Sequence, residues 1–193
     1  MEADWEIEIG GGAAAIEAAW TGFVDLGQNP AHAAQLSEVQ AFPALGEALV
    51  QLNNPASPMW TSKCDFWPQL EPGTWDADEM EAASNQANCA TGGYVDLLPR
   101  QPWTEISEAD AHCRSLCAQL HAAKLTCCRV DLIVRQAWTG KETPTLGLTA
   151  YLTACGATEP EAQARLAACL QAFTSAILTL PHEGALPPDS TLQ

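Results

Sequence analysis

Three side chains that commonly bind metal ions recur at helical spacing: Cys113, Cys117 and His121. Residues four apart share one face of a helix, so the two thiols and the imidazole could point at a single ion. A zinc site needs four ligands and usually shows Cys-x-x-Cys pairs, and this chain contains none. The apolar residues around Cys113 and Cys117 favour packing as small hydrophobic side chains. We therefore predict no metal and no cofactor, and retain these three residues as an alternative metal site.

Cys64 is the best candidate for a catalytic nucleophile. It follows Lys63, the only base among residues 1–99, and a neighbouring ammonium group favours the reactive thiolate. A catalytic cysteine also needs a base within reach, but the four histidines are scattered along the sequence and no Gly-x-Ser-x-Gly motif is present. The aromatic residues around Cys64 favour packing. We therefore predict no catalytic residue, with Cys64 as the alternative.

Acidic residues dominate the first half of the chain. The net charge is −16, and residues 1–99 contain 15 acids against one base. Such a field repels nucleic acid and anionic lipid and accelerates encounter with a cationic partner. The opening sequence is acidic where a signal peptide would be basic, and no apolar run is long enough to span a membrane. We expect a cytoplasmic protein with reduced cysteines that binds neither nucleic acid nor membrane. Solubility alone explains the charge equally well.

Acidic and aromatic residues supply a candidate binding surface. The outward side of a predicted hairpin collects arginines, an aspartate and a tyrosine, although an ordinary cross-strand ion pair between Asp131 and its neighbours would explain the same pattern. Acids of the first strands and of a long loop extend the surface. The candidate partner-binding residues are Glu6, Glu8, Glu17, Trp75, Asp76, Asp78, Glu79, Arg129, Asp131, Arg135 and Tyr151.

These features favour a non-catalytic acidic binding protein. Its seven tryptophans are of the residue type enriched at protein interfaces, and its acids would steer a basic protein or peptide toward it. Bacterial immunity proteins have comparable size and charge, which is a likeness of composition only. We predict an accessory or inhibitory, immunity-like subunit. The alternatives are a small cysteine-dependent or metal-dependent enzyme, and a packing domain of a larger assembly.

Three segments, 4–53, 59–123 and 126–180, each show two strand-like runs followed by a helix-like run. Their shared order suggests an internal ββα repeat. Because each helix carries one apolar stripe, the three helices need a common surface to cover. We predict a single two-layer α+β domain over residues 1–180: a largely antiparallel sheet of about six strands with three helices on one face. Residues 181–193 are expected to form a frayed tail.

The first segment begins with Trp5, Ile7 and Ile9 alternating with acids, which is typical of a strand. Three glycines should then turn the chain into a return strand over 16–26. A helix is expected to follow from about residue 31, and Pro43 should break it, because a proline inside a helix removes a hydrogen-bond donor and clashes with the preceding turn.

In the second segment, residues 59–67 and the run beginning at Tyr94 are predicted strands separated by a long irregular loop. The next helix should be capped by Ser107, with Ile106 beginning its apolar stripe. The third segment pairs strands at 126–138 and 146–155, and the strand period of two places Cys128 in the core and its neighbour Cys127 on the outward side. It ends with a helix capped by Thr158, whose apolar stripe is Leu166, Leu170, Phe173, Ile177 and Leu180.

Overall fold

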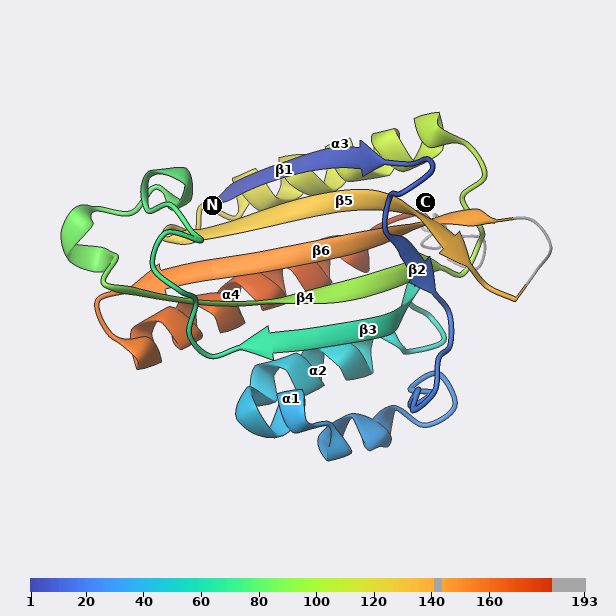
Figure 1. Ribbon diagram of the computed structural model, residues 1–193, viewed down its shortest axis with the longest axis horizontal. Coiled ribbons are helices and arrows are strands. Elements are labelled where there is room, and N and C mark those ends of the chain that lie inside the picture. Colours follow the sequence, from blue (N-terminus) through green and yellow to red (C-terminus); the bar gives the residue numbers. More distant parts are fainter. Residues whose placement is uncertain (141–143, 182–193) are drawn as a thin grey trace, which may run out of the picture.

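The computed structural model describes residues 1–140 and 144–181, whose strands form one six-stranded, mostly antiparallel sheet. The strand order is β1-β5-β6-β4-β3, with β2 also pairing with β5 (Figure 1). The strands are β1 (Glu2–Glu8), β2 (Ala15–Glu17), β3 (Met59–Trp67), β4 (Cys89–Pro99), β5 (Cys128–Trp138) and β6 (Thr145–Gly156). The predicted α+β class and the largely antiparallel sheet are confirmed. Except for Pro181, the predicted frayed tail lies outside the described residues.

The α-helices gather on one side of this sheet, behind the strands in Figure 1, whereas η2 and η3 lie in the loop at one end of the sheet. The described residues contain four α-helices and three short 3-10 turns. They are η1 (Pro30–Gln35), α1 (Ser37–Ala41), α2 (Pro43–Leu52), η2 (Asp78–Met80), η3 (Ser84–Gln86), α3 (Ile106–Ala122) and α4 (Glu159–Ile177). The predicted break at Pro43 is confirmed, since α1 ends at Ala41 and the proline occupies the first turn of α2, where its missing N–H is tolerated.

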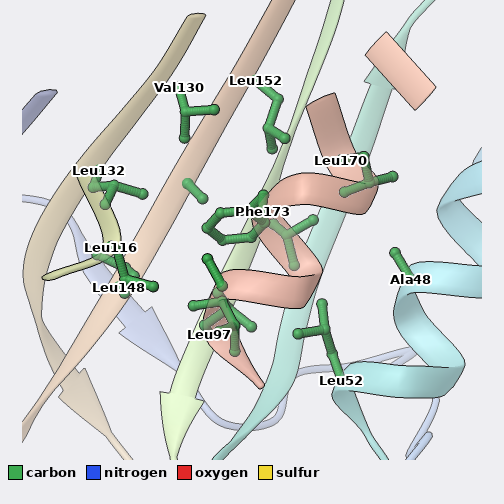
Figure 2. Packing of buried hydrophobic residues seen from close by; sticks show 14 of the residues in the cluster. Ala48, Leu52, Leu97, Leu116, Val130, Leu132, Leu148, Leu152, Leu170 and Phe173 are labelled. Atoms are coloured by element: carbon green, nitrogen blue, oxygen red, sulfur yellow. The ribbon is translucent and has the colours of Figure 1, made fainter. Parts of the chain in front are cut away.

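The core lies between the sheet and α4, which occupies the middle of the helix side. The predicted stripe of α4 is buried, and Phe173 is completely inaccessible to solvent. Figure 2 shows Phe173 surrounded by Leu97, Leu148 and Leu152 of the central strands. In α3 the predicted stripe is buried from Ala109 onward, but Ile106 is 52% exposed because it lies in the first turn, at the end of the sheet.

The predicted hairpin of the first segment is wrong. β1 and β2 both run parallel to β5, pairing with Arg129–Arg135 and Gln136–Trp138 in succession. They are therefore two parts of one interrupted edge strand, and the intervening glycines, with φ of 133° at Gly10 and 93° at Gly12, carry a loop out of its line. Residues 18–26 form no strand. The proposed ββα repeat is consequently not confirmed.

Two predicted helix caps are also corrected. α3 begins at Ile106, so Ser107 lies inside its first turn and the N-cap is Glu105, without a side-chain hydrogen bond. Thr158 is the N-cap of α4 but its hydroxyl does not cap; the Glu161 carboxylate instead accepts a hydrogen bond from the Ala157 N–H at 3.0 Å. Both helices depend on tertiary packing more than on capping.

Candidate functional site

The side of the sheet turned away from the helices carries a continuous polar and aromatic surface, which we call the open face. Its residues alternate with core residues such as Val130, Leu132 and Leu148, so the strand period of two places them on the opposite side. The open face comprises Glu2, Asp4, Glu6 and Glu8 of β1; Arg129, Asp131, Ile133 and Arg135 of β5; Thr149, Tyr151 and Thr153 of β6; Tyr94 and Asp96 of β4; and Asp65 and Trp67 of β3.

Two segments bound the open face at its ends. At one end Ile16 of β2 is buried against Leu98 and Ala137. At the other end the loop 68–88 inserts Met80 into a small satellite core. In Figure 1, β2 and this loop lie at opposite ends of the sheet, and no helix or strand of the described residues crosses the strands between them. The rings of Trp67, Tyr94 and Tyr151 keep part of their surface in contact with solvent, whereas Ile133, Thr149 and Asp96 of the same face are buried.

Charge on the open face is strongly negative. Seven carboxylates, those of Glu2, Asp4, Glu6, Glu8, Asp65, Asp96 and Asp131, share it with two guanidinium groups. Both guanidinium groups are already paired: Arg129 lies 2.7 Å from Asp131 and 3.2 Å from Glu79, and Arg135 lies 3.0 Å from Glu8. The acids at positions 2, 4 and 6 form no ion pair within the described part of the chain. This surface consequently presents uncompensated negative charge.

A chain of hydrogen bonds links four strands across the open face. The Arg135 guanidinium donates to Glu8 and, at 3.1 Å, to the hydroxyl of Thr149. That hydroxyl donates in turn to the Asp96 carboxylate at 2.6 Å. Arg135 also donates to the Tyr151 hydroxyl at 3.4 Å and lies over its ring, 5.8 Å from the centroid. Because the network joins β1, β5, β6 and β4, it fixes these side chains relative to one another.

Aromatic side chains form the centre of the open face. The rings of Trp67, Tyr94 and Tyr151 lie with centroids 5.7 to 6.4 Å apart, within the range of favourable aromatic pairs. The Trp67 indole N–H donates to the Asp65 carboxylate at 3.0 Å, which holds the carboxylate beside the rings. All three rings are half-buried, so each keeps part of its surface in contact with solvent.

Asp96 is the most buried carboxylate of the open face, at 7% exposure. Burial raises its pKa above the ordinary value of 3.8, although the hydrogen bond from Thr149 and the charges of Arg135 and Lys63 oppose this shift. Burial and the negative charges of Asp96 and Asp65 likewise raise the pKa of Tyr94. These two carboxylates therefore place negative charge beside the Tyr94 ring.

The raised pKa of Asp96 predicts a pH-dependent effect of Asp96→Asn. A carboxyl whose pKa is higher in the folded state stabilises the fold at low pH, and this contribution is lost as the pH rises through the folded pKa. The free energy of unfolding of Asp96→Asn, relative to the unmodified protein, should therefore increase from about pH 3 to about pH 7. Urea unfolding of both proteins at several pH values measures this difference. A difference that stays constant or decreases would contradict the burial argument.

The structure brings six of the predicted partner-binding residues onto the open face: Glu6, Glu8, Arg129, Asp131, Arg135 and Tyr151. The other five lie at its two ends. The loop 68–88 carries Asp76 and Asp78, and its Glu79 reaches Arg129. Glu17 lies at the β2 end, 3.8 Å from Lys63.

The predicted ion pair at Asp131 forms, but its partner lies on the same strand. Its partner Arg129 lies two residues earlier on the same strand, whereas we expected a cross-strand pair. The sequence analysis also missed four residues at the centre of the open face: Asp65, Trp67, Tyr94 and Asp96. Their alternation along β3 and β4 was the available signal, and it does not reveal that β4 lies beside β6, the strand of Tyr151, with β3 beyond it.

Trp75 has a structural role at the end of the open face. It is half-buried in the satellite core around Met80, where it anchors the loop 68–88. Its indole nitrogen is buried and has no hydrogen-bond partner among the described residues. Trp75 thus presents less free surface than an exposed interface anchor would.

Cys64 lacks the activation expected from its neighbour. Burial, followed by the charges of Glu38, Asp65 and Asp96, raises the pKa of its thiol to about 12. Lys63 lies instead over the ring of Trp20, 5.0 Å from the centroid, and pairs with Glu17. The expectation that Lys63 would favour a Cys64 thiolate is therefore wrong, because the surrounding carboxylates and burial outweigh the single ammonium group.

The alternative metal ligands do not converge. Cys113 and Cys117 are buried in the core, which raises their pKa values to about 12 and about 11. His121 is exposed, and its Nε2 accepts a hydrogen bond from the N–H of Ala3 at 3.3 Å. Within residues 1–140 and 144–181, no group of three or more His, Cys, Asp and Glu side chains is arranged to hold a metal ion.

Four of the other five cysteines are buried, and Cys89 is half-buried. All eight are free thiols, and Cys128 lies in the main core as predicted. Its neighbour Cys127 was expected to face outward from the same strand, and this is wrong. Cys127 precedes β5, adopts a left-handed backbone with φ of 60°, and is buried in the satellite core.

Comparisons with protein-family models, curated proteins and solved structures found no match to this chain. Among the helices of the described residues, none combines the length and apolar character that a membrane span requires. Inference about function consequently depends on the geometry and charge of the open face.

Proposed function

We propose that this chain is a non-catalytic acidic binding protein, an accessory or inhibitory subunit of the immunity-like kind, that recognises a basic protein or peptide through its open face. The observation that carries the proposal is the concentration of seven carboxylates against two paired guanidinium groups on one accessible side of the sheet. Complementary charge accelerates association and discriminates against acidic partners.

The layout of the open face supports this proposal. Half-buried aromatic rings occupy its centre, and the unpaired acids of β1 lie at its margin. Interfaces between proteins commonly combine an aromatic centre with a polar, solvent-accessible rim. The open face also lies on regular strands, so its side chains are already held in place before a partner arrives, which lowers the entropic cost of binding.

Removing charge from the open face should weaken binding more than removing the same charge elsewhere. We expect the double variant Asp4→Asn/Glu6→Gln to bind a decalysine peptide about tenfold more weakly than the unmodified protein, because each exposed carboxylate contributes about 0.5–1 kcal/mol. Titration calorimetry at low and high salt measures the affinities. The matched control is Glu47→Gln/Glu105→Gln, which removes two exposed acids from the helix side and leaves the same net charge.

Affinity capture extends this test to a protein partner. We expect the unmodified protein and the helix-side control to retain the same basic protein from a lysate of the source cells and to release it at high salt. The variant Asp4→Asn/Glu6→Gln should not retain this protein. Equal affinity of the two double variants for decalysine would overturn the assignment of binding to the open face. Binding that does not weaken with salt would overturn the electrostatic basis of the proposal.

A further inference from the structure

The centre of the open face combines two features suited to one cationic side chain. Trp67, Tyr94 and Tyr151 provide aromatic faces, and Asp65 and Asp96 provide carboxylates on β3 and β4, the strands that also carry Trp67 and Tyr94. We call these five residues the aromatic centre. Their register brings Asp65, Tyr94 and Tyr151 into one row across β3, β4 and β6, with Asp96 two residues along β4 on the same side.

The aromatic centre has capacity for a cation that this chain does not fill. Arg135 lies over Tyr151, but no cation of the described residues lies over Trp67 or Tyr94. Asp96 accepts one hydrogen bond, from Thr149 to its Oδ1, and its Oδ2 accepts none from the described part of the chain. A carboxylate that is 7% exposed and only half satisfied gains substantially from a charged donor.

Arginine matches this arrangement better than lysine. A guanidinium group is planar, stacks on aromatic faces and can present two parallel N–H groups to one carboxylate, whereas an ammonium group is a compact and strongly hydrated charge. The open face already holds one guanidinium group of this chain in a related manner. The Nε and Nη2 atoms of Arg135 both donate to one oxygen of Glu8, its Oε2, while the guanidinium group lies over the ring of Tyr151.

We propose that the aromatic centre receives an arginine side chain of the basic partner, stacked on the exposed surfaces of Trp67 and Tyr94 and hydrogen-bonded to Asp96. This inference rests on the proposed function and adds the chemical identity of the anchoring residue. The unpaired acids of β1 would then contact further basic residues without selecting between lysine and arginine.

Two peptides of equal charge test the proposal: acetylated hexa-arginine and acetylated hexalysine amides, titrated into the full chain by calorimetry. The unmodified protein should bind hexa-arginine about tenfold more tightly than hexalysine. Trp67→Leu and Asp96→Asn should each reduce this preference to about twofold or less, because each removes one half of the recognition. Trp138→Leu, at an exposed tryptophan at the end of β5, and Glu47→Gln, on the helix side, should retain the preference.

The outcomes separate the two proposals. Equal binding of the two peptides, or a preference that survives both Trp67→Leu and Asp96→Asn, would overturn the arginine site. The binding function would still stand if affinity for both peptides fell in Asp4→Asn/Glu6→Gln. Both proposals would be overturned if neither peptide bound the unmodified protein and if, in affinity capture, Asp4→Asn/Glu6→Gln retained the same proteins as the unmodified chain. Circular dichroism verifies that each variant folds. If Trp67→Leu does not fold, Asp96→Asn, which is nearly isosteric, is sufficient by itself to test the arginine site.

Discussion

Replacing Phe173 by alanine should lower the free energy of unfolding by about 3–5 kcal/mol, the largest effect we expect from a single substitution. Phe173 is fully buried at the centre of the core, between α4 and the central strands (Figure 2). Its neighbours belong to different elements that the sheet and α4 hold apart, so they cannot collapse into the space that the ring vacates. The loss therefore combines the transfer free energy of the ring with the cost of a cavity.

Urea or thermal unfolding followed by circular dichroism measures this effect. The matched control is Val50→Ala on α2, where the side chain is 43% exposed and the change should stay within about 0.5 kcal/mol. A loss below about 1.5 kcal/mol for Phe173→Ala would contradict the assignment of Phe173 to a rigid, well-packed centre.

Arg135→Met should lower the free energy of unfolding by about 2–3 kcal/mol, because it removes the cation that joins Glu8, Thr149 and Tyr151. The Arg135 side chain is only 14% exposed, so its hydrogen bonds are stronger than those of a surface pair and water replaces them incompletely. Methionine keeps most of the apolar stem, which confines the change to the guanidinium group.

Arg114→Met is the matched control for this prediction. Arg114 also pairs with a carboxylate, that of Asp110 at 3.0 Å, but its side chain is 67% exposed. Exposed pairs of this kind contribute less than about 1 kcal/mol. If the two variants lost the same stability in urea unfolding, the network across the open face would have no more importance than an ordinary surface ion pair.

These two predictions separate the fold from the surface that it presents. Phe173 stabilises the contact between the helices and the sheet, whereas Arg135 fixes the side chains of the opposite side. A protein that recognises a partner through an open sheet needs both, since a rigid core keeps the strands in register and the network keeps the surface side chains ordered before binding.

The residues suggested for a cysteine-dependent or metal-dependent reaction are not arranged as that chemistry requires. The thiol of Cys64 has a pKa raised to about 12 by burial and by three carboxylates, so the proportion of thiolate near neutral pH is very small. Within the described residues, Cys113, Cys117 and His121 belong to no group that could bind a metal ion. Neither observation depends on the proposed partner.

Alternation and helical periodicity in the sequence were sufficient to predict the α+β class, the β5–β6 hairpin, the stripe of α4 and the break at Pro43. They were sufficient because each depends on residues close together in the chain, where burial on one side imposes a period of two or about 3.6. The excess of acid was likewise visible without a structure.

Tertiary structure alone decided which strands lie side by side. The pattern of β1 specified a strand but not its partner, so the predicted hairpin with the following segment was wrong, and β1 pairs instead with β5, more than a hundred residues later. The same limit hid the aromatic centre: Trp67, Tyr94 and Tyr151 meet only because β6 inserts between β5 and β4. Alternation assigns a side chain to a face, whereas its neighbours across the sheet depend on the register and order of strands that the whole core selects.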